Sequence, residues 1–166
     1  NQIRAPQSSA AFGGMATQWG TKGNLCLEEG EALLVRCNHA GAAFRNATLT
    51  DAFHMTIDYW KRTSSLNSSQ MAADEDGTFT LVVAHRDPGI HNWLDTGGLR
   101  RTIFGKRWQA FDRAAGYEAP WMSARVVRFE ELDREVPDGV RHVTPSEREA
   151  QVAARQAGQV HHEECQ

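Results

Sequence analysis

The sequence lacks the features that mark several common protein classes. It contains only three cysteines, Cys26, Cys37 and Cys165, which cannot all pair, and it has no Cys-x-x-Cys motif. We therefore expect free thiols in a reducing cytoplasm. No apolar run is long enough to span a bilayer, so we expect a soluble protein without a membrane partner. The formal net charge of -3 gives no general attraction to nucleic acid.

Several motifs that carry catalysis or cofactor binding are also missing. The chain has no phosphate-binding loop, no dinucleotide fingerprint and no Gly-x-Ser-x-Gly nucleophile elbow. Cys37 and His39 are close in sequence, but neighbours on a strand or turn rarely converge into a nucleophile–base pair. Arg101 and Lys106 belong to a basic stretch but point to opposite faces of a strand, which disfavours a nucleic-acid patch. The catalytic residues and the cofactor therefore stay unknown at this stage, and we expect no nucleic-acid partner.

The length of 166 residues suits one domain with a single core. The chain begins with Asn1, and the stretch from Asn1 to Ala16 contains Pro, Ser and Gly in a linker-like arrangement. We expect residues 1–22 to be a linker or the end of an upstream region of a longer protein. We expect residues 23–140 to form the folded domain and residues 141–166 to form a C-terminal helix and tail.

Alternation of apolar and polar residues predicts strands along most of the chain. The pattern is clearest in Thr78–His85. The other predicted strands are Glu31–Cys37, Asp51–Trp60, Arg101–Phe111 and Ser123–Leu132. Because turn signals separate these segments and no strand–helix–strand alternation occurs, we expect a mainly β fold. The predicted architecture is an antiparallel β sandwich, jelly-roll-like, with a C-terminal surface helix.

The predicted helix begins at a Thr-Pro-Ser-Glu sequence, residues 144–147. Thr144 can cap the helix, proline fits its first position, and Glu147 can reach back to the cap. The apolar face that follows, to about Ala157, is thin, so the helix is expected to lie on the surface or to extend from the body. The terminal His161–Cys165 stretch resembles a ligand cluster, but its position at the chain end favours a frayed, dispensable tail.

The stretch His85–Trp108, HRDPGIHNWLDTGGLRRTIFGKRW, contains the candidate functional residues. The candidate ligand-binding side chains are His85, Asp87, His91, Asn92, Trp93 and Asp95. His85 and Asp87 are two residues apart at a strand end, which places both on one face, and imidazole and carboxylate groups are competent metal ligands. The paired His-x-His of a cupin is absent, however, so no metal is favoured.

The same stretch also has the features of a structural turn. Pro88-Gly89 fits the centre of a type II turn, and Asp87 can accept hydrogen bonds from the amides that follow. Asn92 can bridge the strands of the loop. Trp93 and Leu94 are too apolar for a solvated loop, so we expect Trp93 to be mostly buried. We favour this structural interpretation, in which Asp87→Asn is a mild change because the amide oxygen still accepts hydrogen bonds.

The order DGTFTLVVAHRDPG, NWLD and RTIFGKRW resembles a bacterial domain of unknown function, family 1214. The resemblance covers about Phe53 to Phe111. It implies a jelly-roll-like β sandwich, found as the C-terminal part of longer uncharacterised bacterial proteins, and it implies no particular reaction. The family often has NWLP where this chain has NWLD at Asn92–Asp95, so the loop geometry need not be the same.

Two functions are consistent with these features. The favoured one is a non-catalytic β-sandwich module of a larger bacterial protein, which binds a small ligand or packs against an upstream partner domain. The alternative is an enzyme, with or without a metal, whose pocket is capped by the Asp87–Gly98 loop. The two are separated by the metal content of the purified protein and by the effects of His85→Ala and His91→Ala.

Overall fold

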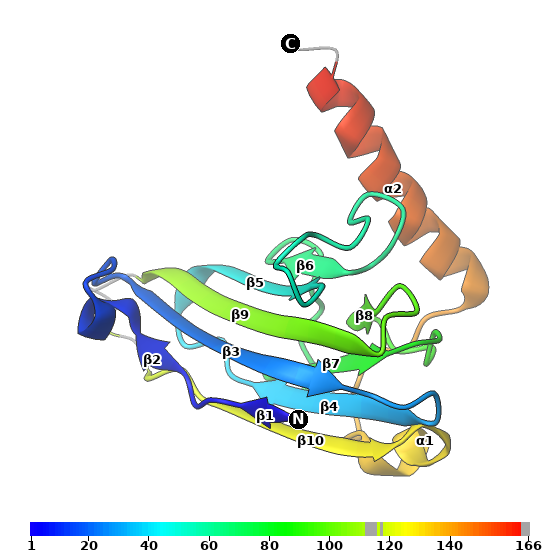
Figure 1. Ribbon diagram of the computed structural model, residues 1–166, viewed down its shortest axis with the longest axis horizontal. Coiled ribbons are helices and arrows are strands. Elements are labelled where there is room, and N and C mark those ends of the chain that lie inside the picture. The colour runs from blue at the N-terminus through cyan, green and yellow to red at the C-terminus, as the bar shows by residue number, and fades with distance from the viewer. Residues whose placement is uncertain (112–115, 117, 164–166) are drawn as a thin grey trace.

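The computed structural model describes residues 1–111, 116 and 118–163. Two β-sheets pack face to face, and a long helix, α2 (Pro145–Glu163), projects away from the sandwich (Figure 1). This arrangement confirms the predicted mainly β fold with a C-terminal helix. In the described part of the chain, no helix is both long and apolar enough to cross a membrane.

The larger sheet has six strands. They are β1 (Gln2–Ile3), β2 (Gln7–Ser8), β3 (Gln18–Cys26), β5 (Ala42–Thr50), β6 (Ser65–Asn67) and β9 (Arg101–Phe111). Their order is β1-β3-β9-β5-β6, and β2 pairs with β3 further along the same edge. All of these pairings are antiparallel.

The smaller sheet has the order β10-β4-β7-β8, with an antiparallel core and a parallel edge strand. Its strands are β4 (Glu31–Cys37), β7 (Phe79–Ala84), β8 (Trp93–Asp95) and β10 (Met122–Arg128). The remaining helical elements are the short η1 (Ser9–Phe12), η2 (Phe129–Glu131) and α1 (Leu132–Glu135).

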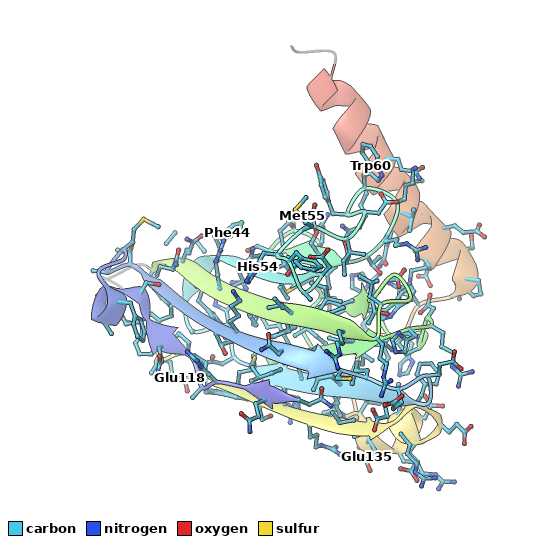
Figure 2. All side chains as sticks on the ribbon, in the orientation of Figure 1. Phe44, His54, Met55, Trp60, Glu118 and Glu135 are labelled. Atoms are coloured by element: carbon cyan, nitrogen blue, oxygen red, sulfur yellow. The ribbon has the colours of Figure 1, made fainter. Side chains whose placement is uncertain are left out.

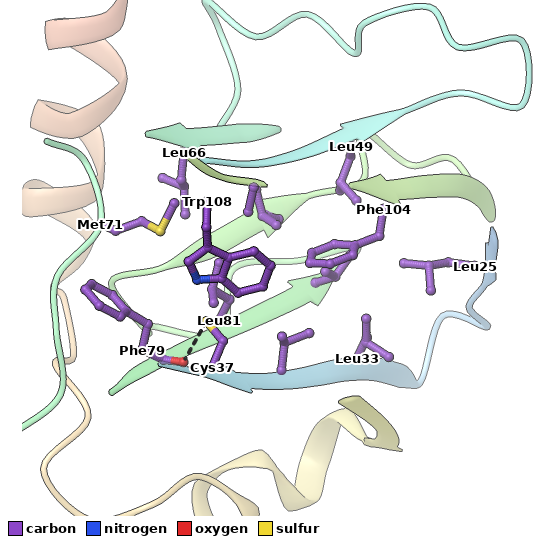
Figure 3. Close-up of a cluster of buried hydrophobic side chains, with 14 of the residues drawn as sticks. Leu25, Leu33, Cys37, Leu49, Leu66, Met71, Phe79, Leu81, Phe104 and Trp108 are labelled. Carbon is purple, nitrogen blue, oxygen red and sulfur yellow. Dashed lines mark hydrogen bonds between the residues drawn. The ribbon is translucent and has the colours of Figure 1, made fainter. Parts of the chain in front are cut away.

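The hydrophobic core lies between the two sheets (Figure 3). Leu81 and Val83 of β7 point into this core, together with Phe104 and Trp108 of β9. The alternate residues of β7 and β4 point to the other face of the smaller sheet, into a second cluster closed by Leu132 of α1. The smaller sheet is therefore covered on both faces, whereas the outer face of the larger sheet carries mostly polar side chains.

Two cations are buried inside the sandwich. Lys106 is fully buried, its ammonium lies 4.7 Å from the ring centre of Trp108, and it has no hydrogen-bond partner among the described residues. Burial lowers the pKa of Lys106. Arg45 is also buried, and its guanidinium carbon lies 5.1 Å from the ring centre of Phe79. The inward position of Lys106 and the outward position of Arg101 agree with their predicted opposite faces.

Four of the five predicted strands are found close to their predicted positions, as β4, β7, β9 and β10. The prediction of a strand at Asp51–Trp60 was wrong, because this segment is a sequence of turns. The carboxylate of Asp51 accepts hydrogen bonds from the amides of Phe53 and Met55, both at 2.8 Å, and this closes the chain on itself. The alternating large side chains at Phe53 and Met55 are consequently exposed, by 85% and 66%.

Residues 1–22 were predicted to form a linker or the end of an upstream region, and the linker part of that prediction does not agree with their strand pairing. β1 and β2 add to the edge of the larger sheet, and β3 already begins at Gln18. Within β3, Trp19 and Leu25 pack against the core, an alternation that the glycines and polar residues between them conceal. The folded unit therefore starts before residue 23.

The reciprocal cap predicted for α2 is present. The Thr144 hydroxyl accepts a hydrogen bond from the Glu147 amide at 3.3 Å, and the Glu147 carboxylate accepts one from the Thr144 amide at 2.8 Å. The Thr144 amide and hydroxyl, which both donate to the Glu147 carboxylate, lower the pKa of Glu147. The helix continues to Glu163, and Cys165 of the predicted ligand-like tail lies outside the described residues.

Candidate functional site

The six residues singled out in the His85–Trp108 stretch serve the fold itself. The two ring nitrogens of His85 contact the Thr96 hydroxyl at 2.7 Å and the Leu27 carbonyl oxygen at 3.0 Å. The Asp95 carboxylate accepts a hydrogen bond from Arg62 at 2.9 Å. Both side chains thus connect the ends of β7 and β8 to neighbouring loops.

Asn92 was predicted to bridge its own loop, and instead it holds another segment. Its side-chain oxygen accepts a hydrogen bond from the Ala72 amide at 2.8 Å. Its amide nitrogen donates to the carbonyl oxygens of Ala72 at 2.7 Å and Thr80 at 3.0 Å. Asn92 is buried, so every polar atom of its side chain is satisfied by backbone.

The other predicted residues form a seat for Arg148 of α2. The Arg148 guanidinium donates to the Asp87 carboxylate at 2.8 and 3.2 Å, and to the carbonyl oxygens of Ile90 and His91. It also lies 5.2 Å from the ring centre of Trp93. Because the Arg148 side chain is only 8% exposed, this contact anchors the first turns of the helix on the sandwich.

Two sequence expectations for this loop are refined by the structure. Asp87 accepts a hydrogen bond from the Gly89 amide at 2.8 Å, as expected for the turn, but it also holds the ion pair with Arg148. Trp93 is mostly buried, as expected, and packs against the second cluster with part of its ring exposed; its ring nitrogen donates to the Ala84 carbonyl oxygen at 3.2 Å. No pattern in the sequence indicated Arg148, because its partner is 61 residues away.

This region therefore offers little to a ligand. Within the described residues, no three His, Cys, Asp or Glu side chains are grouped closely enough to hold a metal ion. An open hollow of about 370 Å³ lies beside His85 and Arg86, but the His85 ring nitrogens are already engaged. The better candidate for a binding site lies elsewhere on the molecule.

A larger hollow lies on the outer face of the larger sheet, and we call it the outer groove. It has a volume of about 410 Å³, and its central residues are Arg4, Lys22, Thr48, His54, Gly105 and Arg107. A second hollow of about 660 Å³ adjoins it and shares Arg4, Lys22 and His54 with it. Together the two hollows form a wide concave surface on this face of the larger sheet.

The floor of the outer groove follows from strand register. Gly20 of β3 lies opposite Arg107 of β9, and Gly105 of β9 lies between Lys22 and Thr48 of its two neighbouring strands. Side chains at alternate positions of a strand share one face. Each glycine therefore leaves a gap between longer outward side chains, and the surface is hollowed at these points.

The groove is walled by two segments that leave the sheet. Arg4 comes from the connection between β1 and β2, and His54 from the turns that follow β5 (Figure 2). His54 has a left-handed backbone, with φ of 66°. Its ring lies 3.2 Å from the ammonium of Lys22, which reaches up from the floor. Residues far apart in sequence thus place three nitrogen-bearing side chains around one opening.

The charge of the outer groove is of one sign. No Asp or Glu is among the residues that line it, although the chain has 21 acidic residues. Arg4, Lys22 and Arg107 have no carboxylate partner in the described part of the chain. Five other arginines do have such partners: Arg36, Arg62, Arg100, Arg125 and Arg148. The groove therefore presents uncompensated positive charge, which favours an anion.

Sequence reasoning missed the outer groove for two reasons. Arg4 lies in the segment interpreted as a linker, and β3 and β5 were not predicted as strands. The alternation of glycine with a basic residue in Gly20–Lys22 and Gly105–Arg107 is the signal that could have indicated a polar, hollowed sheet face. That signal becomes readable only when the two segments are known to pair.

Comparison with known proteins supports the fold and leaves the activity open. No family model matches the chain, and no curated protein matches it. An uncharacterised protein from Burkholderia cenocepacia has a similar crystal structure, with a TM-score of 0.68 and 26% identity over 77% of this chain. A protein from Vibrio parahaemolyticus matches at a TM-score of 0.45 and 17% identity over 64% of this chain. This chain spans 36% and 30% of the lengths of those two proteins. The Burkholderia structure shows that the chain is similar to one part of a longer protein.

Proposed function

We propose that this chain is a non-catalytic β-sandwich module of a larger bacterial protein, and that its outer groove binds a small anionic ligand. The observation that carries the proposal is the set of cations without carboxylate partners, Arg4, Lys22 and Arg107, around one hollow. A ligand bearing a carboxylate or a phosphate is the chemical complement of that set.

Different side chains of the groove can contact the charged, the polar and the apolar parts of a ligand. The planar guanidinium of Arg107 can bind two oxygens of a carboxylate or phosphate at once, whereas Lys22 supplies a compact charge. Thr48 and Thr50 offer hydroxyl groups to polar parts of the ligand, and Ile103 offers an apolar surface at the floor. Such a combination of a few polar groups with an apolar contact is typical of small-molecule sites.

A binding role is favoured over catalysis by the surroundings of His54. A general base is usually oriented by a carboxylate that stabilises its charged form. The His54 ring instead lies 3.2 Å from the Lys22 ammonium, and no ion pair in the described part of the chain joins His54 to a carboxylate. The proposal also places the protein in the cytoplasm, for which the unpaired thiols of Cys26 and Cys37 are the support.

The proposal is tested by calorimetric titration of the protein with citrate and with inorganic phosphate. We expect Arg107→Gln and Lys22→Gln each to weaken binding about tenfold, the scale of one charge-assisted hydrogen bond. Arg101→Gln is the matched control, because Arg101 lies on the same strand and face but outside the hollow. Absence of binding by both anions, or equal losses in all three variants, would refute the proposed site.

A further inference from the structure

The outer groove continues across the sheet beyond its central hollow. A third hollow of about 350 Å³ shares Thr48 with it and extends over β6 to helix α2, where Asn46, Asn67 and Arg155 line it. The three hollows adjoin one another through shared lining residues, and we call them together the trough. It runs from the β1 edge of the larger sheet to the helix.

The strand register gives the trough its length. One row of residues on the outer face passes from Gln7 through Gly20, Arg107 and Asn46 to Asn67, and so crosses five strands. Neighbouring strands are about 4.8 Å apart, so this row spans about 19 Å. A row of that length exceeds one small ligand and suits an extended chain.

The lining of the trough is rich in side-chain amides. Gln2, Gln7, Asn24 and Asn46 line its three hollows, and their side chains make no hydrogen bonds within the described structure. The side-chain oxygen of Asn46 is buried and has no partner. An amide both donates and accepts hydrogen bonds, as a hydroxyl group does. The lining is therefore matched to a ligand that carries many hydroxyls.

A further cation and two aromatic rings lie at the helix end of the trough. The Arg155 guanidinium donates to the carbonyl oxygens of Ser65 at 2.6 Å and Tyr59 at 3.4 Å, and it has no carboxylate partner among the described residues. Phe44 and Tyr59 line the same hollow and are 39% and 45% exposed. Their rings offer apolar faces on which a ring-shaped group can stack.

We propose that the trough binds an acidic oligosaccharide, a chain of sugar units that carry carboxylates or sulfates. This inference rests on the proposed function and extends it: the cations of the outer groove hold acidic groups near the centre of the chain. The amides bind sugar hydroxyls on either side, and Arg155 with its neighbouring rings receives the far end. No acidic side chain among the lining residues repels such a ligand.

A single-stranded nucleic acid is the alternative extended anion for the trough. Proteins that bind it stack successive bases on aromatic side chains along the strand. In the trough, the aromatic residues Phe44 and Tyr59 are confined to the helix end, and Phe12 lies near the opposite edge. The central rows are amides, hydroxyls, glycines and cations, a composition that fits sugars better than bases.

The inference is tested by titrating the protein with galacturonate, its hexamer, a neutral glucose hexamer and single-stranded oligothymidylate. We expect the acidic hexamer to bind at least tenfold more tightly than the monomer, because several subsites are engaged at once. We expect Asn46→Leu and Arg155→Gln to reduce hexamer affinity about threefold and about tenfold while monomer binding stays unchanged. Arg101→Gln is again the matched control, and melting temperatures establish that each variant is folded.

The outcomes of these titrations show which of the two proposals fails. Equal affinity for monomer and hexamer overturns the oligosaccharide inference but leaves the small-anion site intact. Equal affinity for the acidic and neutral hexamers also overturns it, because the cations then contribute nothing. Tighter binding of oligothymidylate than of the acidic hexamer assigns the trough to nucleic acid. Failure of galacturonate, citrate and phosphate to bind at all overturns both proposals together.

Discussion

Arg148→Met tests how helix α2 is attached to the sandwich. The substitution keeps an unbranched side chain of good helix propensity, so it does not disturb the helix itself. It removes the guanidinium that pairs with Asp87 and donates to the carbonyl oxygens of Ile90 and His91. The helix then loses its main polar anchor.

The size of the effect follows from burial. Removal of one partner from a buried ion pair costs about 3–5 kcal/mol because the other charge is left without compensation. Asp87 is 34% exposed on its side chain and regains hydration, which reduces that figure. Two carbonyl oxygens also lose a charged donor, worth about 1–3 kcal/mol where they stay dry. We expect a net loss of about 3 kcal/mol.

The measurement is denaturant unfolding together with amide hydrogen exchange in α2. The matched control is Arg155→Met in the same helix, whose guanidinium has only carbonyl partners, at Ser65 and Tyr59. We expect the control to lose about 1 kcal/mol. Equal losses in the two variants, or unchanged exchange in α2, would show that the seat around Arg148 does not hold the helix.

Three further predictions concern titration, the buried lysine and the loop. Burial and, to a lesser extent, nearby arginines lower the pKa of His91, so below about pH 6.5 the unfolded chain binds more protons than the folded chain. Thermal melts should therefore show a stability that is constant above that pH and falls below it, with a smaller fall in His91→Gln. Lys106→Met removes a buried ammonium that has no hydrogen-bond partner in the described structure, and it should raise the free energy of unfolding, measured by urea denaturation, by about 1–2 kcal/mol. A marked decrease in the free energy of unfolding would mean that the ammonium makes a stabilising contact. Asp87→Asn keeps the acceptor for the Gly89 amide but loses the charge that pairs with Arg148, so calorimetry should show a stability between those of wild type and Asp87→Ala. An unchanged melting temperature would mean that Asp87 stabilises only the turn and not the contact with Arg148.

The strands that were predicted correctly are those whose own residue pattern is enough to identify them as strands. β7 is buried along its whole length, and in β9 the large residues Phe104 and Trp108 are buried whereas Arg101 and Arg107 are exposed, so both patterns are visible in a short window. The reciprocal cap at Thr144 and Glu147 also depends only on neighbours in the chain. Local chemistry decides such features, and local sequence is enough to find them.

The strand predicted at Asp51–Trp60 shows the limit of that approach. Alternation of apolar and polar residues is the same whether a segment is paired in a sheet or folded into turns. Here the Asp51 carboxylate competes for the amides that a strand would have used, and Phe53 and Met55 are left exposed. In the first 22 residues the reverse happened, because glycine and polar residues hid strands that pair at the edge of the sheet.

The outer groove could not be predicted residue by residue. Its charge depends on Arg4, Lys22 and Arg107 being neighbours, and they come from three segments whose pairing no local pattern reveals. The six residues chosen in the His85–Trp108 stretch were reasonable ligands by chemistry. The fold uses their polar atoms for backbone, loop and helix contacts instead.

Local sequence accounts for the mainly β architecture, the start of the C-terminal helix and the turn at Asp87–Gly89, since each depends on residues within a few positions of one another. The tertiary structure alone decided that Asp87 meets Arg148 and that Gly20, Arg107 and Asn46 share one row. Strand register is set by the packing of the whole sandwich, because a shift of one residue would turn every buried side chain outward. The position of the groove is therefore a property of the assembled sheets.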